Sequence, residues 1–167
     1  MTTPLVEQLR YARSELVRGL NDLPPDDAEA HVGPANSISW AIAHLAWQEQ
    51  RYWLQRLDGR TLVPELDRDF CFGCPQTTPS LDDAWSMWRQ VTDAADPVLD
   101  RLTEADLMTQ PVVDGRPVGT TIGSLMLRTI YHYWFHLGES MGFRQALGHR
   151  RLAQFVGDID TQAPYRR

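Results

Sequence analysis

The sequence has little cysteine, no long apolar run and no concentration of positive charge, and each absence excludes a class of protein. Two cysteines in 167 residues cannot form the disulfide framework of a small secreted domain. The longest nearly apolar run covers about residues 38–47, whereas a bilayer-spanning helix needs ~20 residues. The formal net charge is −6, which argues against the phosphate backbone of a nucleic acid as a partner. We therefore expect the chain to bind a small molecule or a second copy of itself.

The beginning of the chain gives no sign of export. The segment MTTPLVEQLRYARSEL carries charges where a signal peptide has its apolar region. This predicts a cytoplasmic protein. In a reducing compartment, Cys71 and Cys74 are expected to be two reduced thiols in a loop. One C-x-x-C without a second ligand pair or a βαβ pattern is weak support for a metal or redox site.

The length of 167 residues suits one domain covering residues 1–167. Apolar residues recur at helical spacing in four long stretches, with helix-start or helix-stop residues at several of their ends. These stretches are about 4–21, 38–57, 81–99 and 121–147. The first is preceded by Thr3, and the third begins at Ser80 with Asp83 in a capping-box spacing. We predict an all-α fold of the four-helix-bundle type.

The connections between these helices carry their own signals. Residues 58–79 contain three prolines and both cysteines without any period, which predicts a long loop between the second and third helices. Pro97 should kink the third helix or end it early. Asp114-Gly115, flanked by valines, predicts a small hairpin before the fourth helix. The tail from His149 onward has little pattern, and we expect it to lie across the surface.

The clearest chemical signal is a pair of histidines, His132 and His136, in the last helix. A spacing of four residues puts both imidazoles on one helix face, with Cβ atoms about 5–6 Å apart, which suits a single transition-metal ion. Apolar residues share this face, so it should point to the interior. His44, in the second helix, is the best candidate for a third ligand, with His31 and His149 as less rigidly placed competitors.

Polar residues surround the three histidines in the helical patterns. Gln48 and Arg51 share the helix face of His44, which is typical of a cavity lining. Arg128 precedes His132 by one turn, and Glu139 follows His136 by three residues. These four residues are candidates to orient a metal ligand or a substrate, and Arg51 or Arg128 could bind a substrate carboxylate. A proton acceptor could be Glu139 or Glu49, although a surface carboxylate is the simpler interpretation of both.

Some apolar residues of the last helix fall on the face expected to meet solvent. They are Leu127, Tyr131, Trp134 and Phe135. A helix that is apolar nearly all round is covered by other parts of the structure. We therefore expect a homodimer in which a partner subunit covers this face.

Several other metal or hydrolase sites do not match the sequence. The segment His132–His136 lacks the glutamate that follows the first histidine in zinc-protease helices. No Glu-x-x-His pair occurs, which disfavours a ferritin-like di-iron site. Residues 138–142 match G-x-S-x-G, but this copy lies inside a predicted helix and not at a strand-turn-helix elbow.

The histidine-bearing segments SISWAIAHLAWQEQRYW and YHYWFHLGESMGFRQALG, with Thr121-Ile122-Gly123 before the second, resemble the DinB-like superfamily. These damage-inducible and YfiT-type proteins are four-helix bundles that include mycothiol- and bacillithiol-dependent S-transferases. The resemblance implies a metal site in which His44, His132 and His136 bind zinc, nickel or another divalent ion. It does not settle an activity.

Three imidazoles leave at least one coordination position open, as in catalytic sites. Such a metal lowers the pKa of bound water toward ~7 and deprotonates a bound thiol. The leading hypothesis is a thiol-dependent S-transferase using a low-molecular-weight thiol, or a metal-assisted hydrolase, acting on a small molecule. The alternatives are a structural metal that joins the second helix to the fourth, and a dimeric module that binds a small electrophile or hydrophobic ligand.

Overall fold

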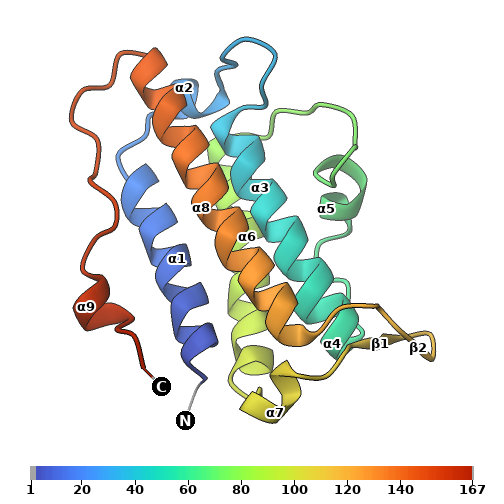
Figure 1. Cartoon of the computed structure of the whole chain (residues 1–167). Coiled ribbons are helices and arrows are strands. Elements are labelled where there is room, and N and C mark those ends of the chain that lie inside the picture. The colour runs from blue at the N-terminus through green and yellow to red at the C-terminus, as the bar shows by residue number, and fades with distance from the viewer. Residues whose placement is uncertain (1–2, 167) are drawn as a thin grey trace.

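The computed structural model describes residues 3–166, and long helices make up most of it (Figure 1). The long segments are α1 (Pro4–Leu20), α3 (Ile38–Glu49) with its continuation through η1 (Gln50–Gln55) and α4 (Arg56–Asp58), α6 (Leu81–Leu99) and α8 (Ile122–Ala146). Helix α8 packs against α1 and α3, and α6 packs against α3. Figure 1 shows α8 running in the direction of α1 and against that of α3. The all-α prediction is confirmed.

Shorter elements connect the long helices. They are α2 (Pro25–Glu29), α5 (Pro64–Asp69), α7 (Glu104–Leu107), β1 (Val112–Val113), β2 (Arg116–Pro117) and α9 (Ile159–Gln162). The predicted hairpin is present as the antiparallel pair β1–β2. Its turn residues Asp114 and Gly115 both have positive φ, 51° and 75°. Two-residue hairpin turns need this conformation, which Asp-Gly adopts readily.

Hydroxyl side chains begin three of the long helices. Each accepts a hydrogen bond from the backbone N–H three residues further on, and the acceptors are Ser37, Ser80 and Thr121. One such cap stabilises a helix by about 1 kcal/mol. At the other end of the second long segment, Gly59 adopts the left-handed conformation with φ 67°, as C-terminal glycines commonly do.

Pro97 does not shorten its helix, and the predicted loop at 58–79 contains a short helix. Helix α6 continues through Pro97 to Leu99, so this proline does not end it early. Pro97 lies in the last turn, where the backbone carbonyl that loses its donor belongs to the exposed residue Asp93. The predicted loop at 58–79 contains α5, which begins with Pro64 at its first turn. Six residues are too few for helical periodicity to stand out in a sequence.

A buried polar cluster joins all four long helices, with one residue from each. Its members are Arg13 of α1, Glu49 of α3, Trp88 of α6 and Tyr133 of α8. The Arg13 guanidinium donates two hydrogen bonds to the Glu49 carboxylate, and the Tyr133 hydroxyl donates to Glu49 Oε1 at 2.5 Å. Trp88 Nε1 donates to the Tyr133 oxygen at 2.7 Å. Glu49 is therefore a fully buried ion-pair partner, and its interpretation as a surface carboxylate was wrong.

The C-terminal tail lies along α1, as Figure 1 shows. Gln8 Nε2 donates a hydrogen bond to the Ala163 carbonyl at 2.6 Å. The Phe155 ring packs closely against Gly19, where a Cβ atom would come within 2.7 Å of the ring. Phe155 and Tyr11 both contact Trp134. The chain itself therefore covers Trp134, without any contribution from a partner subunit.

Other apolar residues of α8 stay exposed. Tyr131 and Phe135 expose 65% and 64% of their surface, and Leu127 exposes 38%. No helix in residues 3–166 is long and apolar enough to cross a bilayer.

Candidate metal centre

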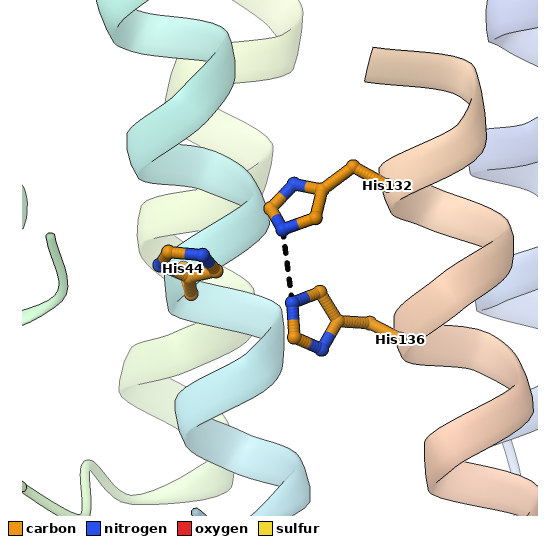
Figure 2. Close-up of side chains that lie close together, drawn as sticks. All are labelled: His44, His132 and His136. Carbon is orange, nitrogen blue, oxygen red and sulfur yellow. Dashed lines mark hydrogen bonds between the residues drawn. The ribbon is translucent and has the colours of Figure 1, made fainter. Parts of the chain in front are cut away.

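Three histidines from two helices converge between α3 and α8 (Figure 2). His44 comes from α3, and His132 and His136 are one turn apart on α8. One ring nitrogen from each lies within 4.8 Å of the others. The His132 and His136 Nε2 atoms are 3.0 Å apart. Antiparallel packing of the two helices therefore places His44 opposite the gap between the two rings of α8.

Hydrogen bonds at the far ring nitrogens fix which atoms face the centre. His44 Nδ1 donates to the Phe70 carbonyl at 2.7 Å, and His136 Nδ1 donates to the Glu139 carboxylate at 2.9 Å. In a neutral imidazole the other nitrogen is then an unprotonated acceptor. Both Nε2 lone pairs are thus available, and each ring is held in place by an outer partner, as metal-binding histidines usually are.

The third ring is incompletely satisfied. His132 Nδ1 is buried without a hydrogen-bond partner, and its Nε2 faces that of His136. Since His136 Nε2 is an acceptor, His132 Nε2 must carry the proton that joins them. The metal-free centre therefore leaves one buried ring nitrogen without any hydrogen bond, which is unusual for a buried polar atom.

Two tryptophans of α3 enclose the His44 ring. The Trp40 ring stacks on it with a centroid distance of 4.5 Å, and the Trp47 ring lies at 5.1 Å with an interplanar angle of 21°. Trp40 precedes His44 by four residues and Trp47 follows it by three, so all three share one helix face. This stacking limits the rotation of the imidazole.

Burial keeps two of the three histidines, His44 and His132, uncharged at neutral pH. Desolvation, with the nearby His136, lowers the pKa of His44 to about 4. Desolvation, with the positive charges that His136 and His44 can carry, lowers the pKa of His132 to about 3. Metal ions bind neutral imidazole. These two side chains are thus in the ligand form well below pH 7.

The donor set fits a divalent transition-metal ion. Imidazole nitrogens suit zinc, nickel, copper and iron, and three of them leave a coordination position free. In residues 3–166, no carboxylate or thiol joins the three histidines as a fourth ligand. The competing histidines lie elsewhere: His31 bonds to Ala35 and Thr78, and His149 bonds to Asp27 and Arg144.

The cysteine prediction needs a correction. Cys71 and Cys74 are joined as a disulfide and are not two reduced thiols. A tight turn with Gly73 at φ 83° brings their Cα atoms within 5.2 Å, a separation that a disulfide can bridge. The disulfide directly follows Phe70, whose carbonyl holds His44. Its sulfurs are bonded to each other and add no ligand to the centre.

The four candidate residues around the histidines have different surroundings. Glu139 contacts His136 directly and is half-buried. Gln48 is buried, and its Oε1 has no hydrogen-bond partner. Arg51 is exposed, with its guanidinium 5.4 Å from the Trp47 ring centroid, and Arg128 is exposed one turn before His132. The G-x-S-x-G segment at 138–142 lies inside α8, so no hydrolase elbow is present there.

Sequence reasoning missed two parts of the centre. The first is the Phe70 carbonyl, a backbone group from a loop, for which a sequence carries no signal. The second is Trp47, whose spacing of three residues from His44 was visible and could have indicated a stacked ring.

Comparison with known proteins identifies the family. No match to a curated protein was found. The sequence model of the DinB superfamily matches residues 8–140. This region includes all three histidines, both tryptophans that enclose His44, and the whole of the buried polar cluster. The chain therefore belongs to the DinB superfamily.

Proposed function

We propose that this protein is a divalent-metal-dependent enzyme that acts on a small molecule. The observation that carries the proposal is the convergence of three imidazoles from α3 and α8 without a fourth protein ligand in residues 3–166. Structural zinc sites are usually closed by four protein ligands, whereas catalytic sites keep a position for water or substrate. We infer that the long helices form the four-helix bundle of this superfamily, with the ion bound by His44, His132 and His136.

The bound ion, zinc or nickel in this proposal, lowers the pKa of a thiol or water molecule at its open position, which makes a nucleophile at neutral pH. The residues around it supply orientation. The Phe70 carbonyl and Glu139 hold two of the imidazoles. Gln48 Oε1, buried without a partner, is available to accept a hydrogen bond from a substrate N–H or O–H group.

The reaction that we put first is thiol-dependent S-transfer, with a low-molecular-weight thiol as the cosubstrate. The ligand set supports metal-assisted hydrolysis equally well, and the superfamily resemblance includes S-transferases. The two reactions differ in what they consume, since transfer removes thiol in proportion to product and hydrolysis does not. A coupled measurement of free thiol and electrophile loss therefore separates them.

The buried polar cluster argues against a metal that only joins helices. Glu49 and Tyr133 already connect α3 to α8 by a hydrogen bond of 2.5 Å, and they lie close in sequence to His44 and His132. A metal ion whose role is to join α3 to α8 would add little to the stability of an interface that these side chains already connect. The histidine centre, by contrast, leaves one buried ring nitrogen, His132 Nδ1, without a hydrogen-bond partner.

Metal content is the first test. Untagged wild type, His44→Ala and the double variant His132→Ala/His136→Ala are compared by elemental mass spectrometry. We expect about one zinc or nickel per chain in wild type and none in either variant, with circular dichroism unchanged. His31→Ala is the matched control, because His31 lies in the loop between α2 and α3 and forms its hydrogen bonds with Ala35 and Thr78, and this variant should keep its metal.

Two outcomes would contradict the proposal. If the wild-type protein stays metal-free after titration with zinc and nickel, the proposed enzyme has no metal ion to activate a nucleophile. Loss of folding in His44→Ala would favour the structural-metal alternative.

We further propose that the protein forms a homodimer through the exposed apolar residues of α8. Leu127, Tyr131 and Phe135 lie along one line of the helix surface, at intervals of four residues. Light scattering at micromolar concentration should give twice the mass of 19.1 kDa, and Tyr131→Glu should reduce it to one chain. A wild-type monomer would refute this.

The alternative of a module that only binds a small electrophile predicts binding without turnover. The cytoplasmic location stays a prediction.

A further inference from the structure

Three arginines without carboxylate partners lie on the helical segments that carry the metal centre, Arg51 and Arg56 after His44 and Arg128 before His132. The chain contains no lysine, so arginine supplies every cationic side chain of the 16 counted. Eight arginines in residues 3–166 form ion pairs with carboxylates, and they are Arg10, Arg13, Arg18, Arg60, Arg68, Arg101, Arg144 and Arg166. Arg51, Arg56 and Arg128 form none there, although they are close to one another.

The π-helical segment η1 explains how two of them come together. Arg51 lies in η1, and Arg56 directly follows it. In an α-helix, residues five apart point about 140° away from each other. In a helix bonded from residue i to residue i+5, they lie one above the other. The π segment thus places both arginines on one side, and such segments frequently occur at functional sites.

Aromatic rings hold the two guanidinium groups in position. The Arg51 guanidinium lies 5.4 Å from the Trp47 ring centroid, and that ring stacks on His44. The Arg56 guanidinium lies 4.8 Å from the centroid of the Tyr52 ring. Such cation–π contacts orient a guanidinium without neutralising it. Arg51 is therefore linked to the metal centre through a single stacked ring.

Arg128 adds the third charge from the opposite helix. It lies one turn before His132 on α8, which runs against α3 (Figure 1), so in the chain direction it falls toward the same end of the centre as Arg51. Burial lowers the pKa of Arg56, and the positive charges of Arg51 and Arg128 lower it further. Asp67, which contacts the Trp47 ring nitrogen, accepts hydrogen bonds from Trp47 and Gln55 with its two oxygens.

We propose that Arg51, Arg56 and Arg128 bind an oxyanion group of the substrate, a carboxylate or a phosphate. Like charges held together without a counterion repel one another, and an anion between them removes that cost. Guanidinium groups match carboxylate and phosphate oxygens in paired hydrogen bonds. This inference rests on the proposed function and names the substrate class of the same site: a small anion whose reacting group reaches the metal.

Calorimetric titration with inorganic phosphate and with succinate tests the site directly. Both metal-free and zinc-loaded protein are titrated, and zinc content is measured on the same samples. We expect one equivalent of at least one probe to bind, and the tighter probe identifies the oxyanion class. Arg51→Gln, Arg56→Gln and Arg128→Gln should each weaken binding at least tenfold. Arg116→Gln is the control, because Arg116 is exposed on β2 and forms no ion pair in residues 3–166.

A thermal shift gives a second readout that needs no ligand. Without added anion, Arg128→Gln should raise the melting temperature by about 1–2 °C, because one like-charge repulsion is removed. Arg116→Gln should leave it unchanged. Absence of binding of both probes at 10 mM, or equal binding by wild type and the three variants, would overturn the inference.

The outcomes also separate this inference from the proposed function. Zinc binding without anion binding would remove the oxyanion site and leave the metal-dependent enzyme. If the protein binds the anion through these arginines but binds no metal, the oxyanion site is kept and the metal-dependent enzyme is excluded.

Discussion

The interface between α3 and α8 contains two groups of buried polar side chains, and they differ in how far the protein satisfies them. In the buried polar cluster, the Arg13 charge meets the Glu49 carboxylate, and Tyr133 and Trp88 complete the network. In the histidine centre, two Nε2 atoms face each other and the His132 Nδ1 has no partner.

The difference separates a structural group from a binding group. A buried network that is complete stabilises one packing arrangement and needs nothing from solvent. A buried ring nitrogen without a partner, such as His132 Nδ1, costs free energy and adds nothing to the packing. Both groups have members on α3 and α8, so the contrast between them comes from side-chain chemistry.

The largest effect should come from breaking the complete network. Glu49→Ala leaves the Arg13 charge buried without its main partner, and we expect the free energy of unfolding to fall by about 3–5 kcal/mol. Urea denaturation of metal-free protein measures this loss. Glu65→Ala is the control, because Glu65 is exposed on α5 and forms no ion pair in residues 3–166, and it should cost less than ~1 kcal/mol. A loss below 1 kcal/mol for Glu49→Ala would mean that Asp96 alone can compensate Arg13.

A change of pH should act on the histidine centre. His44 has a folded-state pKa of about 4, below the unfolded value of 6.5, so between these values the unfolded chain binds more protons. The contribution of His44 to the free energy of unfolding is therefore fully present above about pH 6.5 and is lost as the pH falls toward 4. The loss from His44 alone is on the order of 3 kcal/mol. Melting curves of metal-free wild type should show this slope, and His44→Ala should flatten it.

Removing one hydroxyl from the complete network should have an intermediate effect. Tyr133→Phe leaves Trp88 Nε1 without its acceptor and Glu49 with one donor fewer. The expected loss is about 1–2 kcal/mol by urea denaturation. Tyr131→Phe, two residues earlier on the exposed face of α8, is the matched control and should change nothing. Equal effects in the two variants would show that the network does not stabilise the fold.

The smallest effect on the fold should come from His132→Ala. This change deletes a buried nitrogen that has no partner, which offsets the cavity it creates, and metal-free stability should change by less than ~1 kcal/mol. The same substitution should abolish metal binding. Zinc at one hundred times its dissociation constant should stabilise wild type by about 2.7 kcal/mol and leave the variant unchanged. Zinc stabilisation of the variant would exclude His132 as a ligand.

Much of the fold could be predicted from local sequence. Helix starts at Ser80 and Thr121 and the hairpin at Asp114-Gly115 depend on nearest neighbours, and the structure contains all three. The three histidines could be brought together because helical spacing fixes two of them, and His44 was the third histidine in a long predicted helix, a choice that the superfamily resemblance supported.

What the sequence did not reveal depends on contacts between distant segments. Glu49 was taken as a surface carboxylate because its partner, Arg13, is 36 residues away. Trp134 was expected to meet another subunit because nothing in the pattern shows that Phe155 covers it. The Cys71–Cys74 disulfide was missed because compartment, and not turn geometry, was used to decide it.

That disulfide has a practical consequence for any assay of thiol transfer. It begins one residue after Phe70, whose carbonyl orients His44. A small thiol supplied as cosubstrate is also a reagent for thiol–disulfide exchange with this bond. Kinetics measured at rising thiol concentration therefore combine two processes, consumption of the cosubstrate and opening of the loop beside a metal ligand. The double variant Cys71→Ser/Cys74→Ser isolates the first, and its comparison with wild type measures the second.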